Sequence, residues 1–147
     1  MLEIGDKLPE FKSVNQDGKR ISSKDLLGKP TIVYFYPIDD TPGCTREACS
    51  FRDNFHKFNG VNLVGVSTQG QESHKKFSDK YRLNFTLVVD KKKQISKTFG
   101  VLKVTGTASR STFIFDKKGE LKFVYPAVTP DGHSREVLEK LKELGLI

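Results

Sequence analysis

The strongest constraint on the fold is a strand signal that leads directly into a helix signal. Residues 31–36 (Thr-Ile-Val-Tyr-Phe-Tyr) form an apolar run typical of a strand buried on both faces. Thr41 then suits the N-cap of a helix, and Pro42 suits its first position. Cys44 therefore falls in the first helical turn, where backbone amides lack intrahelical partners and the helix dipole favours negative charge. Such a position stabilises a thiolate.

Strand and helix signals alternate along the rest of the chain. Strands are predicted at residues 11–14, 20–22, 31–36, 61–66, 85–89, 112–115 and 121–125, with helices after Thr41 and at residues 72–81, 94–99 and 134–144. Hairpin turns are expected at residues 15–18 and 116–119, and Ser23 is expected to cap a brief helical turn before Gly28. This order predicts an α/β sandwich with a mixed sheet. Without a visible repeat or linker, residues 1–147 are expected to form one domain.

The only other cysteine, Cys49, lies on a different face of the predicted helix from Cys44. Cys44 faces the sheet because it belongs to an apolar stripe, made of Cys44, Ala48, Phe51, Phe55 and Phe58. Cys49 points roughly 140° away, and helical geometry separates the two Cα atoms by roughly 8.5 Å. A disulfide tolerates a Cα separation of up to about 7 Å. A bond between the two cysteines therefore requires the helix to unwind between about residues 41 and 50.

The helix dipole alone is too weak to keep a buried thiol ionised. It contributes at most about 2 kcal/mol, and burial opposes the thiolate. A guanidinium within about 4 Å offers roughly 4 kcal/mol before desolvation is subtracted. Arg46 and Arg52 point off the apolar stripe, whereas Arg110, just before the strand at 112–115, can reach the helix N-terminus. Glu47, one turn from Cys44, can hold that arginine in place.

Composition argues against several other classes of function. The net charge is +7, but the basic residues are dispersed, so we expect a solvated surface and no nucleic-acid partner. No apolar run of about 18 residues predicts a membrane span. The first residues lack a signal-peptide core, which favours the cytoplasm, where disulfides are usually transient. His56, His74 and His133 have no metal-ligand spacing with the cysteines, so we expect no metal and surface positions for all three.

The segment Pro37-Ile-Asp-Asp-Thr41-Pro-Gly-Cys44 resembles the Pro-x-x-x-Thr-x-x-Cys motif of the peroxiredoxins. A second cysteine five residues later is similar to the PrxQ, or bacterioferritin-comigratory, subfamily. The resemblance extends through residues 65–67, 72–77 and 110–116 to the closing helix. One departure is local: residues 68–71 (Thr-Gln-Gly-Gln) replace a Pro-Asp type turn, which puts oligomer contacts in doubt more than chemistry.

The resemblance implies a thioredoxin-like fold with an added N-terminal hairpin and a thiol-dependent peroxidase activity. By this match Cys44 is the peroxidatic cysteine, Cys49 is the resolving cysteine, and Thr41 and Arg110 bind the peroxide oxygens. The cycle passes from a sulfenic acid on Cys44 to an intramolecular disulfide, which a thioredoxin- or glutaredoxin-like dithiol reduces. The peroxide is hydrogen peroxide or an organic hydroperoxide.

The same resemblance assigns supporting roles to three further residues. Pro37 matches the proline that shields the thiolate, Glu47 matches the acid that orients the arginine, and Gly43 belongs to the motif itself. The family chemistry requires no metal or organic cofactor, and the subfamily favours a monomer.

Two other functions stay open at this stage. A thioredoxin-type disulfide oxidoreductase usually carries Cys-x-x-Cys facing a cis-proline, and the chain has neither pattern: residues 105–112 contain no proline. A thiol redox sensor or basic binding module without turnover is the second alternative. Cys49 could also be an inert surface thiol, because some peroxiredoxins use a partner's thiol instead.

Overall fold

The structure is a computed structural model that describes all residues from 1 to 147. Its centre is a five-stranded mixed sheet with the strand order β5-β4-β3-β6-β7. Strands β3, β4 and β5 are parallel, whereas β6 runs antiparallel to β3 and β7 antiparallel to β6. The strands are β3 (Thr31–Phe35), β4 (Asn62–Ser67), β5 (Thr86–Val89), β6 (Ser111–Phe115) and β7 (Leu121–Tyr125).

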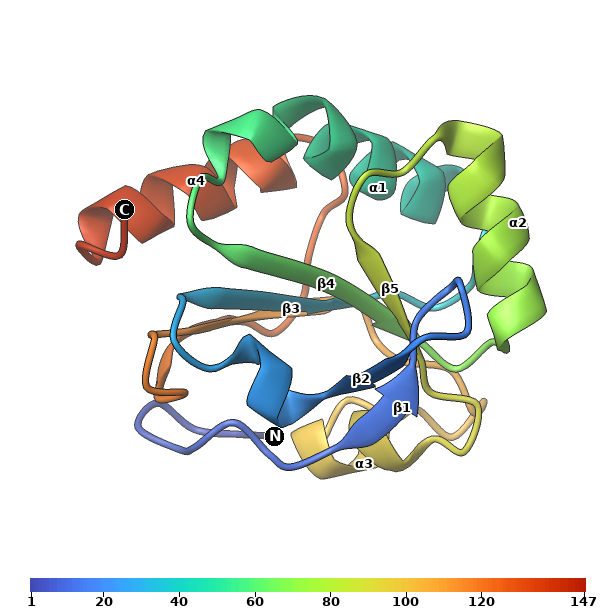
Figure 1. The fold of residues 1–147 in the computed structure, drawn as a ribbon, viewed down its shortest axis with the longest axis horizontal. Coiled ribbons are helices and arrows are strands. Elements are labelled where there is room, and N and C mark those ends of the chain that lie inside the picture. Colours follow the sequence, from blue (N-terminus) through green and yellow to red (C-terminus); the bar gives the residue numbers. More distant parts are fainter.

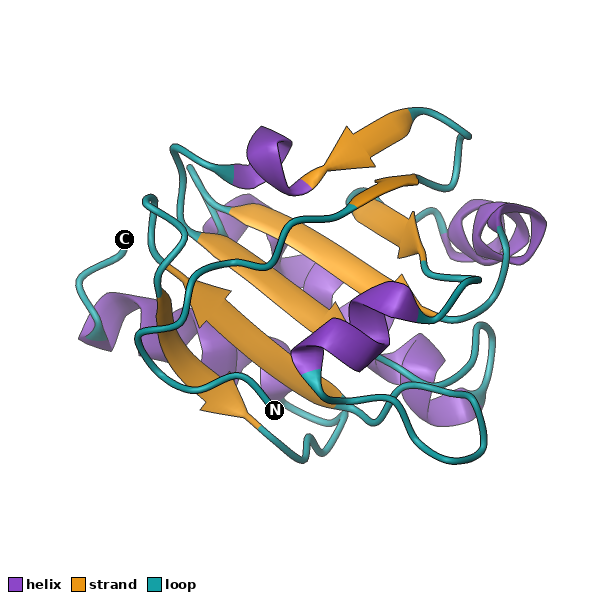
Figure 2. Ribbon diagram, turned by 90° about the horizontal axis from the view of Figure 1, so that it is seen from below, coloured by secondary structure: helices purple, strands orange, loops and turns teal.

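Two layers cover the sheet (Figure 1). On one side lie α1 (Pro42–Asn54), α2 (Gln71–Tyr81) and α4 (His133–Glu143), and a short 3₁₀ turn, η2 (Phe55–Lys57), follows α1. On the other side lie α3 (Gln94–Phe99) and an N-terminal hairpin of β1 (Lys12–Val14) and β2 (Arg20–Ser22), followed by η1 (Ser23–Leu26). Figure 2 views this second side and shows α3 in front of the sheet and the hairpin next to the β5 edge. The structure is thus the expected α/β architecture with an N-terminal hairpin.

Strand β3 is buried on both faces, as its apolar run predicts. Ile32 and Tyr34 belong to the core beneath α1, α2 and α4, whereas Val33 and Phe35 belong to the core beneath α3 and the N-terminal segment. Alternate side chains of a strand point to opposite faces, so one apolar run supplies both cores. All four side chains are at most 1% exposed.

The predicted elements are all present, with small shifts at their ends. The helix at residues 94–99 and the strand at residues 121–125 have the expected bounds. The final helix begins at His133, one residue early, and α1 ends at Asn54 before the end of the apolar stripe. The prediction that Ser23 caps the first helical turn was wrong: Ser22 occupies that position, and its amide donates to Asp25 Oδ2 at 2.8 Å.

The expected surface positions of the three histidines are correct only for His56. His74 and His133 are both 0% exposed. Each buried ring has partners within hydrogen-bond distance of both nitrogens, which removes most of the cost of burying a polar group.

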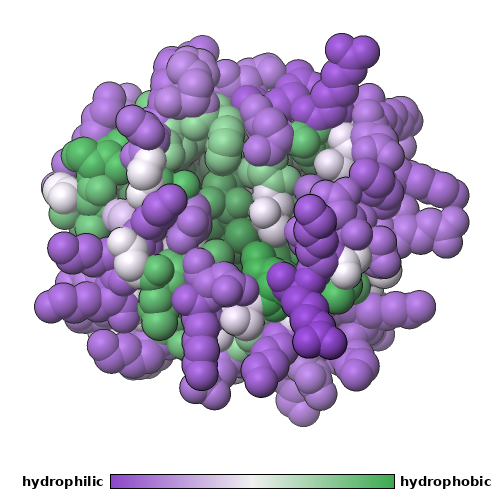
Figure 3. All heavy atoms as spheres, in the orientation of Figure 1, coloured by the Kyte–Doolittle hydropathy of each residue, from purple (hydrophilic) through white to green (hydrophobic).

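The outer surface is largely polar on the face shown in Figure 3, where hydrophilic side chains surround apolar ones gathered near the middle. None of the helices combines the length and the apolar character that crossing a bilayer requires.

Helix α1 packs on the sheet through an aromatic contact, and the aromatic ring on the sheet has room only because the residue beside it in β4 is a glycine. Phe51 stacks on Tyr34 of β3 with ring centroids 4.9 Å apart. Tyr34 in turn fills the space above Gly65 of β4, where an added Cβ would lie 2.9 Å from the tyrosine ring. Tyr34 is almost fully buried, so its ring has little room to retreat.

Replacing Gly65 with alanine should therefore lower the free energy of unfolding by about 1–3 kcal/mol through overpacking. Urea denaturation measures the loss, with Gly70→Ala as the control because a Cβ there meets only a flexible lysine side chain at 3.6 Å. Equal stability of the two variants would contradict the close fit between Tyr34 and β4.

Candidate active site

Cys44 lies in the first turn of α1 and is 1% exposed. Thr41 has the extended backbone of an N-cap, but its side chain does not cap the helix: Oγ1 donates to the carbonyl of Ile38 at 3.0 Å. The first helical backbone bond runs from the Thr45 amide to the Thr41 carbonyl. The amides of Gly43 and Cys44 therefore remain without intrahelical partners, and they leave partial positive charge beside the thiol.

The expected arginine contact is present. Arg110 donates from Nη2 to the Cys44 sulfur at 3.3 Å and from Nη1 to Glu47 Oε1 at 2.9 Å. Its side chain is 18% exposed, whereas that of Glu47 is 1% exposed. One guanidinium thus lies between a thiol and a carboxylate, in surroundings where water screens their charges weakly.

Burial and charge compete at this cluster. Burial opposes the charge of Arg110, but the neighbouring Cys44 and Glu47 outweigh it and raise the pKa of the guanidinium. Burial raises the pKa of Glu47 from 4.5 to about 7, because the charge and hydrogen bond of Arg110 only partly offset it. The second oxygen of Glu47, Oε2, has no hydrogen-bond partner. Glu47 therefore binds a proton far more readily than an exposed glutamate does.

Gly43 leaves room for the guanidinium. A Cβ at this position would lie 3.1 Å from Arg110 Nη2 and 3.5 Å from Pro130 Cγ. Pro130 belongs to the segment between β7 and α4, which is tied to the same arginine because the Val128 amide donates to the Arg110 carbonyl at 3.0 Å. The glycine thus allows both the arginine and this segment to pack against the helix N-terminus.

Cys49 is a free, partly buried thiol in the middle of α1, separate from the arginine cluster. Burial raises its pKa; Arg52 acts in the opposite direction and Asp53 adds to the increase. Cys49 is therefore a neutral thiol in the folded helix at neutral pH.

Comparison with known proteins identifies the chain's relatives. Residues 4–124 match the AhpC/TSA family. The chain belongs to this family.

Two curated relatives and one solved structure illustrate the match. Peroxiredoxin Q of Populus jackii is 44% identical over 95% of this chain and 68% of the relative. A putative peroxiredoxin of Coxiella burnetii is 40% identical over 95% and 99% of the two chains. The Xanthomonas campestris bacterioferritin comigratory protein superposes with a TM-score of 0.88 at 29% identity, over 95% and 99%. The predicted PrxQ-type membership and thioredoxin-like fold are confirmed, and the protein is a thiol-dependent peroxidase, an oxidoreductase.

Sequence reasoning missed a second polar network beneath the peroxiredoxin motif. Asp39 of the motif is buried and hydrogen-bonded to His74 of α2 at 2.7 Å. Gln69, in the turn that departs from the family pattern, accepts from the Asp39 amide at 2.8 Å and donates to the Pro37 carbonyl at 3.1 Å. The departure therefore affects the loop that carries the site, in addition to any oligomer contact. Two signals of this network were present in the sequence: Asp39, a polar residue inside the motif, and His74, near the start of an amphipathic helix.

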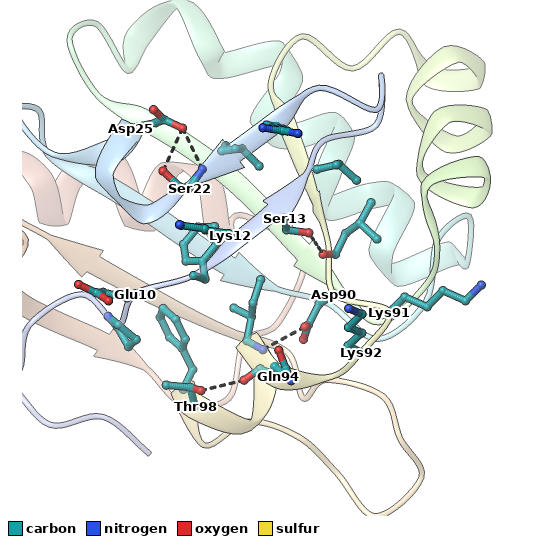
Figure 4. A pocket seen from close by; sticks show the side chains of 18 residues that line it. Glu10, Lys12, Ser13, Ser22, Asp25, Asp90, Lys91, Lys92, Gln94 and Thr98 are labelled. Carbon is teal, nitrogen blue, oxygen red and sulfur yellow. Dashed lines mark hydrogen bonds between the residues drawn. The ribbon is translucent and has the colours of Figure 1, made fainter.

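A cavity outside the cysteine site lies far from this chemistry. It measures about 890 Å³ and lies between the N-terminal hairpin and α3 on the opposite side of the sheet from α1 (Figure 4). Apolar side chains such as Phe11 and Phe99 and charged ones such as Lys12 and Lys92 line it, and none of the residues of the cysteine site contributes. Because a peroxide is small, the chemistry of this peroxiredoxin needs no cavity of that size.

The raised pKa of Glu47 has a measurable effect on stability. Between about pH 4.5 and pH 7 the folded chain holds a proton that the unfolded chain releases, so stability falls as the pH rises through this window. In a Cys44→Ser background, which removes thiol ionisation, the free energy of unfolding should decline relative to a further Glu47→Gln variant by about 3 kcal/mol in total.

Urea unfolding across this pH range measures the difference between the two proteins. Parallel curves would contradict the account, because they would mean that Glu47 titrates alike in the folded and unfolded states.

Proposed function

We propose that Cys44 is the peroxidatic nucleophile of this peroxidase. The supporting observation is the single guanidinium of Arg110 that contacts both the Cys44 sulfur at 3.3 Å and Glu47 at 2.9 Å. It favours the thiolate, and Glu47 fixes its orientation. The thiolate attacks one oxygen of the peroxide, the O–O bond breaks, and the other oxygen leaves and takes up a proton. Cys44 becomes a sulfenic acid and the peroxide becomes water or an alcohol.

The surrounding groups are suited to hold the peroxide and to stabilise the leaving oxygen. Arg110 and the free amides of the first helical turn supply positive charge where negative charge develops. The hydroxyl hydrogen of Thr41 is already committed to the Ile38 carbonyl at 3.0 Å. Its oxygen lone pairs therefore remain to accept the O–H of a bound hydroperoxide. Pro37, partly buried in the segment between β3 and α1, limits access of water to this region.

Cys49 is proposed as the resolving cysteine. Its thiol condenses with the Cys44 sulfenic acid, which forms the disulfide and releases water. Because the two side chains start on different faces of α1, the first turns of the helix must unwind for the bond to form. Unwinding also exposes Cys49 to water, which removes the burial that raises its pKa.

We further propose that a thioredoxin-type dithiol reduces the disulfide and that the protein acts as a monomer in the cytoplasm. The substrate class is hydrogen peroxide and organic hydroperoxides. The related Xanthomonas protein, whose solved structures concern its alkyl peroxide reduction activity, supports the organic class.

Peroxide-dependent oxidation of NADPH through thioredoxin and its reductase tests the cycle. Wild type should turn over, Cys44→Ser should be inactive, and Cys49→Ser should stop after one turnover. After one equivalent of peroxide, the intact mass of wild type should be two hydrogens lower, and that of Cys49→Ser one oxygen higher. Unchanged turnover of Cys49→Ser would remove Cys49 as the resolver, and activity of Cys44→Ser would contradict the proposed nucleophile.

A further inference from the structure

Outside the cysteine cluster, the most unusual group is the imidazole of His74, which is 0% exposed. Its Nδ1 lies 2.7 Å from Asp39 Oδ2, and its Nε2 lies 3.0 Å from the backbone carbonyl oxygen of Val88 in β5. Asp39 lies five residues before Cys44, in the segment that joins β3 to α1. The ring thus connects the reactive loop to α2 and to the sheet.

Each of these two contacts requires a proton on the ring nitrogen that makes it. A backbone carbonyl can only accept, so Nε2 must be the donor to Val88. Asp39 already accepts from the Tyr36 hydroxyl at 2.6 Å and from the Ser73 hydroxyl at 2.7 Å, which marks it as an ionised carboxylate. Burial would raise the pKa of Asp39, but these hydroxyls and His74 outweigh it and lower that pKa. Nδ1 therefore donates as well.

We propose that His74 is a positioning residue of the peroxidase: as a doubly protonated imidazolium, it forms a buried ion pair with Asp39 that fixes residues 37–41 beside Cys44. The inference rests on the proposed function for its effect on the reaction, whereas the ion pair itself stands on the geometry. The other groups around the ring are the Tyr36 ring, with centroids 6.2 Å apart, and the Ser73 hydroxyl, and neither carries charge at neutral pH.

The loop needs such an anchor because part of its backbone is strained. Asp40 has φ of 59°, a left-handed conformation that costs a non-glycine residue of the order of 1 kcal/mol. On one side of it, Asp39 is held through its carboxylate by His74 and through its amide by Gln69 at 2.8 Å. On the other side comes Thr41, the N-cap residue of α1. Loss of the ion pair would let Thr41 and the helix N-terminus move relative to Arg110, which is held separately at the start of the neighbouring strand β6.

The other histidines provide internal comparisons. His133 is equally buried, but its Nε2 lies 2.8 Å from the Thr112 hydroxyl, which can either donate or accept, so geometry does not force a second proton. Burial lowers the pKa of His133, although Glu136 opposes this effect. His56 is exposed. The two buried rings should therefore differ in their number of protonated nitrogens.

Nitrogen-15 NMR of histidine-labelled protein at neutral pH tests the protonation state directly. Two protonated ring nitrogens are expected for His74 and one for His133; the Asp39→Asn and His74→Gln variants assign the His74 signals. A single protonated nitrogen on His74 at neutral pH would overturn the proposal.

A double-mutant cycle tests the ion pair and its effect on catalysis. His74→Gln leaves a buried carboxylate without its counter-ion, Asp39→Asn leaves a buried imidazolium unpaired, and the double variant contains neither charge. The sum of the losses in unfolding free energy of the two single variants should exceed the loss of the double variant. Additive losses would contradict the ion pair.

The functional readout is the rate constant for oxidation of Cys44 by hydrogen peroxide in a single turnover, which depends neither on Cys49 nor on the reductant. His74→Gln should lower it at least about tenfold, and the exposed control His56→Gln should leave it unchanged. A wild-type rate in folded His74→Gln would refute the positioning role. If wild type itself failed to react, the proposed function would fall, while the NMR and stability results would still decide the ion pair.

Discussion

One guanidinium between a thiol and a carboxylate is the interaction on which the site depends. Its location follows from the sheet topology: β6 runs antiparallel to β3, so Phe35, at the end of β3, pairs with Ser111, at the start of β6. Arg110 therefore lies beside the point where the chain leaves β3 and enters α1. Cys44 and Arg110 meet because the end of β3 and the start of β6 lie side by side in the sheet.

In the proposed catalytic cycle, the same interaction allows the structural change in α1 to be reversed. In the reduced state, the charge of Arg110 and the partner oxygen of Glu47 hold the first turns of α1 in place. Oxidation of Cys44 to a sulfenic acid removes the negative charge on sulfur and weakens that hold. Glu47 lies between the two cysteines in the chain, so unwinding to form the disulfide also breaks its contact with Arg110. Reduction restores the thiolate and favours the helix again.

The sequence predicts the parts of the structure that local patterns determine. The apolar run at β3, the Thr-Pro start of α1 and the angular positions of Cys44 and Glu47 on the helix all follow from periodicity and capping. The contacts of Asp39, Gln69 and His74 do not follow, because they join residues about 30 or more apart that no local pattern relates. Surface positions were expected for His74 and His133 since polar side chains are usually exposed, and only the folded chain shows the partners that permit burial.

The central claim is that the Arg110 guanidinium favours the thiolate form of Cys44 over the thiol, and the ultraviolet absorbance of the thiolate measures this most directly. The measurement uses a Cys49→Ser background, so that only one thiol contributes. The further change Arg110→Met should markedly lower the thiolate absorbance of Cys44 at a fixed pH. Equal thiolate absorbance with and without the guanidinium would contradict the account.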